Sequence, residues 1–297
     1  MDFEYLQYRA IDLFSRAFPR RFAYSVGGLL ANLMFAGDEK GRRAVISNLR
    51  RILSFRGLAP TERKLRRLAR ETYHNFAKYQ VDFFKLRRMS REAVERIVTV
   101  ENACFYEQAI SSGRGAIALS AHLSSWEIAV LDACSRRYAV NLVYFPTRSP
   151  KAGDLFQMRR RERGAKVYPL GKAASAVFEA IRRKEWVALL GDIDFGPRDD
   201  LVSFCGAPAR LPIGPARLCI KLKAPILPGF VVRKPDDNFL LRLHPPIVPD
   251  ESTTVEEIRE RIRAAIERAV MENPTHWFVF IDFWDIEESK KLAVEGF

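Results

Sequence analysis

The stretch AIALSAHLSSWEIAV, residues 116–130, joins two different patterns. Residues 116–119 form a short apolar run, which is typical of a buried strand, and a helical pattern begins at Ser125. His122 lies between them, just past the end of the expected strand. The stretch therefore has two interpretations. Either His122 is a reactive histidine with Glu127 as its partner, or the segment is an ordinary strand-to-helix turn before a capped helix.

Strand-like and helix-like segments alternate along the rest of the chain. The expected strands are residues 116–119, 141–145, 165–169, 186–190, 201–205, 226–233 and 239–243, with a last strand-like run at 277–283. The expected helices are residues 125–137, 155–163, 173–183, 215–223 and 255–271. This alternation predicts an α/β fold, in which a central, mostly parallel mixed sheet is flanked by helices.

The first 96 residues are predicted to be helical throughout. Residues 61–86 place apolar side chains three and four positions apart, which puts them on one helix face, and basic side chains begin the other face. We therefore expect a helical, membrane-associating region at residues 1–100 and an α/β core at residues 101–297, joined as one continuous domain.

The positive charge is concentrated at the start of the chain. The net charge is +13, and residues 1–100 hold 21 Lys and Arg against 10 Asp and Glu. A localised basic surface attracts nucleic acid or an anionic membrane. No nucleic-acid recognition motif is present, and the aromatic residues of the 61–86 helix lie on its apolar face, so we expect a membrane rather than nucleic acid.

Three further patterns indicate where the protein is located. Residues 22–37 carry no charge over 16 positions, which is short of the roughly 20 apolar residues of a spanning helix, so we expect an interfacial or buried helix. The chain start has two acids before its first base, unlike a secretory signal. The four cysteines form no C-x-x-C pair and are expected to be free thiols in a reducing compartment.

Polar residues follow several expected strands. Ligands of α/β sheets bind beyond the carboxyl ends of the strands, so side chains at these ends are expected to converge on one site. The residues at or near these strand ends are His122, Glu127, Arg148, Asp192 and Asp194.

Glu127 has two compatible roles. Ser124-Ser125-Trp126-Glu127 matches the S-x-x-E capping box, in which the Glu side chain reaches back to the Ser backbone N–H. Alternatively, the Glu127 carboxylate accepts the Nδ1–H of His122. The Nε2 atom of His122 then acts as a general base toward a hydroxyl.

Other chemistries have weaker support. The sequence has no G-x-S-x-G nucleophile elbow, and no P-loop or G-x-G-x-x-G follows an expected strand. His122, Asp192 and Asp194 are possible metal ligands by type, but no H-E-x-x-H or H-x-H accompanies them. We therefore expect no metal.

Seven short motifs occur in a defined order. They are Asn48-Leu49, HLSSWE at 122–127, Val143-Tyr144-x-Pro146, Arg160-x-x-x-Gly164, Leu190-x-Asp192, Phe204-x-Gly206-x-Pro208 with Pro212-x-Gly214-Pro215-Ala216, and Asn273-Pro274-x-x-Trp277. Their order resembles that of the bacterial lipid A biosynthesis acyltransferases, the lauroyl and myristoyl transferases. It also resembles their relatives that acylate phosphatidylinositol mannosides. The HLSSWE motif is similar to the H-x4-D/E motif of glycerolipid-type acyltransferases.

The resemblance implies an O-acyltransferase. Such an enzyme moves a fatty acyl chain from an acyl carrier protein or CoA thioester to a hydroxyl of a membrane lipid or glycolipid, without a cofactor or a covalent intermediate. It also implies a peripheral or monotopic protein at the cytoplasmic face of the bacterial inner membrane. A non-catalytic peripheral lipid-binding protein is the alternative.

The resemblance also implies roles for individual residues. His122 would be the general base, and Glu127 or Asp192 would orient it. Arg160 would bind the anionic part of the acceptor or stabilise the oxyanion. The remaining expected substrate-binding residues are Arg148 and Asp194. Phe145 and Ile193 stand where the family's V-Y-R-P and D-Q motifs have Arg and Gln.

Overall fold

The protein is built around one seven-stranded sheet. The computed structural model describes residues 2–87, 89–111, 113–147, 149–194 and 200–288. The strands are β1 (Val98–Glu101), β2 (Ala116–Ser120), β3 (Val140–Tyr144), β4 (Lys166–Pro169), β5 (Trp186–Leu190), β8 (Ile226–Arg233) and β9 (Phe239–Leu243). Their order is β1-β9-β8-β2-β5-β3-β4, and only the β8–β9 pair is antiparallel. The predicted α/β fold with a mostly parallel mixed sheet is confirmed.

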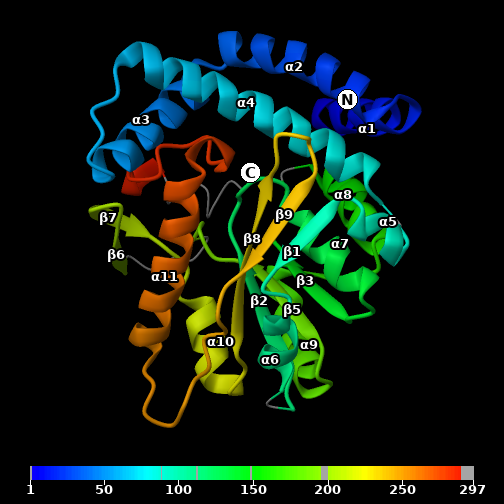
Figure 1. Ribbon diagram of the computed structural model, residues 1–297, viewed down its shortest axis with the longest axis vertical. Coiled ribbons are helices and arrows are strands. Elements are labelled where there is room, and N and C mark those ends of the chain that lie inside the picture. Colours follow the sequence, from blue (N-terminus) through cyan, green and yellow to red (C-terminus); the bar gives the residue numbers. More distant parts are fainter. Residues whose placement is uncertain (1, 88, 112, 148, 195–199, 289–297) are drawn as a thin grey trace.

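Helices cover both faces of the sheet (Figure 1). One face packs against α5 (Arg91–Glu95), α6 (Cys104–Ile110) and α7 (Glu127–Ser135). The other face packs against α9 (Ala173–Arg182), α10 (Gly214–Leu222) and α11 (Val255–Glu272). Central strands are therefore buried on both sides, which explains why they are almost continuous apolar runs rather than alternating ones.

The N-terminal helices lie across the end of the sheet where β2 and β5 finish (Figure 1). They are α1 (Phe3–Ala17), α2 (Arg20–Gly37), α3 (Glu39–Phe55) and α4 (Glu62–Lys85), and α8 (Pro150–Glu162) packs beside α1. Tyr79 of α4 stacks on Trp126, with ring centroids 4.3 Å apart. Within the described ranges, no helix combines the length and apolarity needed to cross a membrane.

Two strand predictions differ from the structure. Residues 201–205 form part of a separate antiparallel hairpin, β6 (Leu201–Phe204) with β7 (Ala207–Arg210), and do not join the sheet. Residues 277–283 are not a strand, although Leu123 and Trp277 form an isolated bridge. The aromatic alternation of this run resembles a strand pattern, but Phe278 and Phe280 pack on the aromatic face of α4 instead.

A buried polar cluster connects α2 and α4 to the sheet. Asp82 of α4, 1% exposed, accepts hydrogen bonds from Arg20, Tyr24 and Arg233. Arg233, at the end of β8, also donates to the hydroxyl of Ser125 at 3.0 Å. We call these five residues the Asp82 cluster. Because the segment that follows His122 contains Ser125, the cluster joins the N-terminal helices to that segment.

Candidate active site

Strand pairing brings His122 and Asp192 together. β2 and β5 are parallel neighbours, and Ser120 lies opposite Leu190 at their shared end. Gly191 follows directly, and a Cβ atom on it would lie 2.8 Å from Cδ1 of Leu119. The missing side chain therefore lets the two chains continue close together beyond the sheet, so that residue 192 reaches residue 122.

Asp192 is the carboxylate that holds His122. Its two oxygens accept hydrogen bonds from Nδ1 and from the backbone N–H of His122, both at 2.9 Å. Trp277 donates its indole N–H to the same carboxylate at 2.9 Å. Asp192 is fully buried. Burial raises the pKa of Asp192, but the His122 ring and the three hydrogen bonds outweigh burial and hold that pKa below its ordinary value.

This contact sets the tautomer of the histidine ring. A carboxylate at Nδ1 favours the tautomer with the proton on that atom, so Nε2 is the nitrogen that can accept a proton. The His122 side chain is 16% exposed and lines a cavity. The backbone carbonyl of His122 accepts from Phe278, and the N–H of Ser124 donates to His276. The 276–278 segment therefore holds the backbone of the His122 turn through two hydrogen bonds, one at His122 and one at Ser124.

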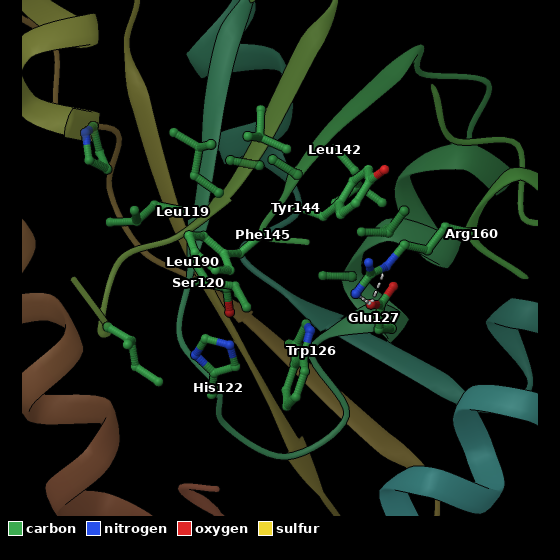
Figure 2. A pocket seen from close by; sticks show the side chains of 18 of the residues that line it. Leu119, Ser120, His122, Trp126, Glu127, Leu142, Tyr144, Phe145, Arg160 and Leu190 are labelled. Atoms are coloured by element: carbon green, nitrogen blue, oxygen red, sulfur yellow. Dashed lines mark hydrogen bonds and ion pairs between the residues drawn. The ribbon is translucent and has the colours of Figure 1, made fainter. Parts of the chain in front are cut away.

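Glu127 contacts two arginines. Its Oε1 atom lies 2.8 Å from Nη2 of Arg160, and its Oε2 atom lies 3.2 Å from Nη1 of Arg163. Figure 2 shows the Glu127 carboxylate directed toward Arg160, with Trp126 between Glu127 and His122 in that view. Of the two carboxylates expected near His122, Asp192 is therefore the one that contacts its ring, and Glu127 holds the arginines.

The predicted capping box is wrong. Helix α7 begins at Glu127, and its N-cap residue, Trp126, makes no side-chain capping bond. Ser124 has a φ of 53°, whereas an N-cap residue is normally extended. Its backbone N–H donates to His276 and is not left for Glu127.

Arg160 lies in the last turn of α8, and Arg163 is the C-cap residue that follows the helix. Arg163 is almost fully buried and also donates to the carbonyls of Phe83 and Leu86 at the end of α4. Arg160 lines the cavity and donates to Gln157 at 3.2 Å. Burial lowers the pKa of Arg160, but the charge and hydrogen bond of Glu127, together with Tyr79 and Tyr144, outweigh burial and raise that pKa above its ordinary value. Arg160 is therefore a fixed cation at the cavity wall.

Two of these residues, Arg163 and Trp277, were not predicted from the sequence. Arg163 was hidden in a run of basic residues, although its spacing of three from Arg160 places both on one helix face. Trp277 belongs to the last of the seven motifs, but its hydrogen bond to Asp192 was not predicted. Of the other expected site residues, Asp194 lines the cavity and pairs with Arg210 at 3.3 Å. Arg148 lies outside the described residues.

The cavity has a volume of about 850 Å³ and a deep apolar part. Small residues of α7 and of the sheet face beneath it line this part, namely Ala118, Ala129, Ala133 and Ala188. Tyr106 and Trp186 line its far end. Trp186 begins β5 and Leu190 ends it, so the space extends about 13 Å along the strand at 3.3 Å per residue.

A second part of the lining is more polar. It comes from α1, α4 and α8, with Tyr8, Gln80 and Gln157, and from α10 with Arg217. His122 lines the same cavity and lies near Ser120, Leu190 and Trp126 (Figure 2). The arrangement can hold a long apolar chain by its reactive end, next to a nitrogen base and a fixed cation.

Comparison with known proteins gives the family. The family described as bacterial lipid A biosynthesis acyltransferase matches residues 5–285. The phosphatidylinositol mannoside acyltransferase of Mycobacterium tuberculosis (strain CDC 1551 / Oshkosh) is 22% identical over 240 residues, which cover 75% of this chain and 72% of that protein. The protein of the same name from Mycolicibacterium smegmatis (strain ATCC 700084 / mc(2)155) is 22% identical over 285 residues, covering 94% and 91%.

Among solved structures, the 1-acyl-sn-glycerophosphate (LPA) acyltransferase PlsC from Thermotoga maritima aligns with a TM-score of 0.39 and 14% identity. The alignment covers 86% of this chain and 98% of that one. The family match extends over nearly all of the chain. The chain belongs to the bacterial lipid A biosynthesis acyltransferase family, and it is an acyltransferase of lipid biosynthesis.

Proposed function

We propose that the protein transfers a fatty acyl chain from an acyl thioester to a hydroxyl of a membrane lipid or glycolipid, with His122 as the general base. The observation that carries this proposal is the position of His122. Its ring is oriented by buried Asp192 and lines a cavity of about 850 Å³ that has both apolar and polar lining residues. An acyl chain fits the apolar part, and a lipid headgroup fits the polar part.

The reaction follows from this placement. The Nε2 atom of His122 takes the proton of the acceptor hydroxyl while its oxygen attacks the thioester carbonyl. The resulting tetrahedral intermediate breaks its carbon–sulfur bond, and the thiol leaves with the proton from His122. Asp192 stabilises the imidazolium that exists between these steps, because its negative charge lies 2.9 Å from Nδ1.

Arg160 binds the anionic part of the acceptor in this proposal. A guanidinium matches phosphate geometry and carries a permanent charge. Glu127 positions Arg160 through the ion pair and does not touch the reacting atoms. Asp194, on the cavity wall, offers a hydrogen-bond acceptor to acceptor hydroxyls.

The acceptor we favour is a glycolipid. The two mycobacterial relatives are named for the acylation of phosphatidylinositol mannosides, and the family is named for lipid A. Both acceptors combine sugar hydroxyls with phosphate. The Gln and Tyr side chains at the mouth suit sugar hydroxyls, and Arg160 suits the phosphate.

We further propose that the protein lies on an anionic leaflet, at the cytoplasmic face of the inner membrane. Helix α2 exposes Leu29 and Leu33, 66% and 69% exposed, and α1 exposes Phe3, which is 79% exposed. Apolar side chains on a helix surface insert readily into the headgroup region. Basic residues of α4 are also exposed, namely Arg63, Lys64, Arg66, Arg67 and Arg70.

The test is an acyl transfer assay. The purified protein is incubated with bacterial membrane lipids and with labelled acyl carrier protein or CoA thioesters, beside His122→Ala. The control is His74→Ala, which removes a histidine that contacts Asn32 in the N-terminal helices and does not line the cavity. We expect label in a lipid with wild type and His74→Ala only. Equal transfer by His122→Ala would overturn the general-base role.

A further inference from the structure

Ser120 carries a buried hydroxyl that the fold does not use. Its Oγ atom is shielded from solvent and has no hydrogen-bond partner. An unsatisfied buried polar group costs about 1–3 kcal/mol, and folded proteins pair nearly all of them. Ser120 is the last residue of β2. Because this hydroxyl has no partner and Ser120 lines the cavity, it is free to bond to a ligand there.

The strand geometry places this hydroxyl between the histidine and the acyl space. Side chains alternate along β2, so Ser120 shares a face with Ala118. Both residues line the cavity, and Ala118 belongs to its deep apolar part. Figure 2 shows the Ser120 hydroxyl pointing to the side of the strand on which the His122 ring lies. Ser120 is therefore located where an acyl chain entering the deep part would place its carbonyl group.

We propose that Ser120 is a catalytic residue whose hydroxyl donates a hydrogen bond to the carbonyl oxygen of the acyl thioester. This inference rests on the proposed acyl transfer and adds the group that stabilises its transition state. When the acceptor oxygen attacks, the carbonyl π electrons move onto that oxygen, and the Ser120 O–H stabilises the oxyanion. When the oxyanion collapses, the carbon–sulfur bond breaks and the ester remains. Ser120 keeps its proton throughout.

Two features make Ser120 a better oxyanion donor than the nearby cation. The Arg160 guanidinium already binds the Glu127 carboxylate and Gln157. A serine hydroxyl without a partner can rotate toward the oxygen as charge develops on it. Because its surroundings exclude water, the bond it forms is stronger than the same bond in solution.

The chain contains a matched control. Ser124 also has a buried hydroxyl without a hydrogen-bond partner, two residues after His122 instead of two before it. Ser124 does not line the cavity. Replacing either serine with alanine removes one oxygen atom close to His122, but only Ser120→Ala removes it from the reaction space.

The experiment compares Ser120→Ala, Ser120→Thr, Ser124→Ala and His122→Ala in the acyl transfer assay, with melting temperatures and intact-protein mass spectra. We expect Ser120→Ala to lower kcat about 10²-fold or more, with KM for the thioester changed less than about threefold. Its melting temperature should stay equal or rise, because an unpaired hydroxyl has been removed from the interior. Ser120→Thr should recover most of the rate, and Ser124→Ala should match wild type.

Three results would overturn the inference. The first is a wild-type rate in Ser120→Ala. When His122→Ala is inactive in the same assay, that result leaves the proposed function standing. The second is a fall in the melting temperature of Ser120→Ala large enough that unfolding at the assay temperature explains its lower rate. The hydroxyl would then stabilise the fold and have no part in catalysis. The third is an added acyl mass on Ser120, which would make it a nucleophile. Undiminished transfer by His122→Ala would instead reject the proposed function.

Discussion

Asp192 binds His122 twice, once at the ring Nδ1 and once at the backbone N–H. The carboxylate therefore fixes the ring's tautomer and the position of the main chain that carries it. We expect Asp192→Asn to lower kcat about 10²–10⁴-fold, because an amide neither favours the Nδ1–H tautomer nor stabilises the imidazolium. Transfer rates with saturating donor test this. A rate within a factor of about three of wild type would show that the pairing has no part in catalysis.

Glu127→Gln should act mainly on stability and on acceptor binding. The substitution leaves two nearly buried guanidinium groups, of Arg160 and Arg163, without their counter-charge. Breaking one side of a buried ion pair costs about 3–5 kcal/mol. Urea unfolding should show a loss of this order. The double variant Glu127→Gln with Arg163→Met should regain part of it, since one unpaired charge is removed. Equal stability of the single variant and wild type would contradict this account.

Ala188→Leu should shorten the acyl chain that the enzyme prefers. Ala188 lies midway along β5 and lines the deep apolar part of the cavity. A leucine side chain there would block the route to Trp186. In a competition between thioesters of different lengths, we expect the variant to select shorter chains than wild type while keeping its rate on the shortest. An unchanged length profile would show that the chain does not enter beneath α7.

The buried ring of His276 makes stability depend on pH. Burial lowers its pKa from 6.5 to about 4, and the nearby charges of Arg233 and Lys78 act in the same direction. The unfolded chain binds this proton below pH 6.5, but the folded protein does not until about pH 4. Stability therefore falls as pH drops through this window, by roughly 3 kcal/mol across all of it. Urea unfolding at pH 7 and pH 5 should show this loss in wild type and less of it in His276→Gln. Parallel pH dependence in both proteins would exclude His276 as the cause.

The exposed leucines of α2 should govern attachment to vesicles. Burying a leucine side chain contributes about 1.5–3 kcal/mol, so the double variant Leu29→Ser with Leu33→Ser should bind anionic vesicles at least about tenfold more weakly. Val248→Ser, an exposed apolar residue beyond β9, is the control. Vesicle flotation at low and high salt separates the apolar from the electrostatic contribution to vesicle binding, because salt weakens only the electrostatic one. Flotation of the double variant equal to that of the control would show that α2 does not contact the lipid.

Regular periodicity made most of the fold predictable. The expected strands 186–190, 226–233 and 239–243 match β5, β8 and β9 residue for residue. The apolar runs of β5 and β8 exist because helices cover both faces of the sheet there, and an unbroken apolar run in the sequence indicates such a strand directly. The prediction of a strand at 277–283 was wrong. Alternating aromatic residues do not show whether a neighbouring strand has backbone groups free to pair with them.

The site was less predictable than the fold. The strand-end rule named His122 and Asp192, but it could not decide between Asp192 and Glu127 as the partner of the histidine. That choice depends on how closely β2 and β5 continue beyond the sheet, where a Cβ atom on Gly191 would crowd the side chains of Leu119 and Ile266. Ser124 shows a related failure. Its residue type suits a helix cap, but its backbone is held in the left-handed region by the 276–278 segment.

The Asp82 cluster limits how far the N-terminus can be shortened to obtain a soluble preparation of this enzyme. Cutting away residues 1–37 would remove the most exposed apolar helices, and it would also remove Arg20 and Tyr24 from a carboxylate that is 1% exposed. Asp82 would keep Arg233, the same arginine that holds the hydroxyl of Ser125. Point substitutions on the exposed side of α2 are therefore a better route to a detergent-free preparation than truncation, because they leave the inner side of that helix in place.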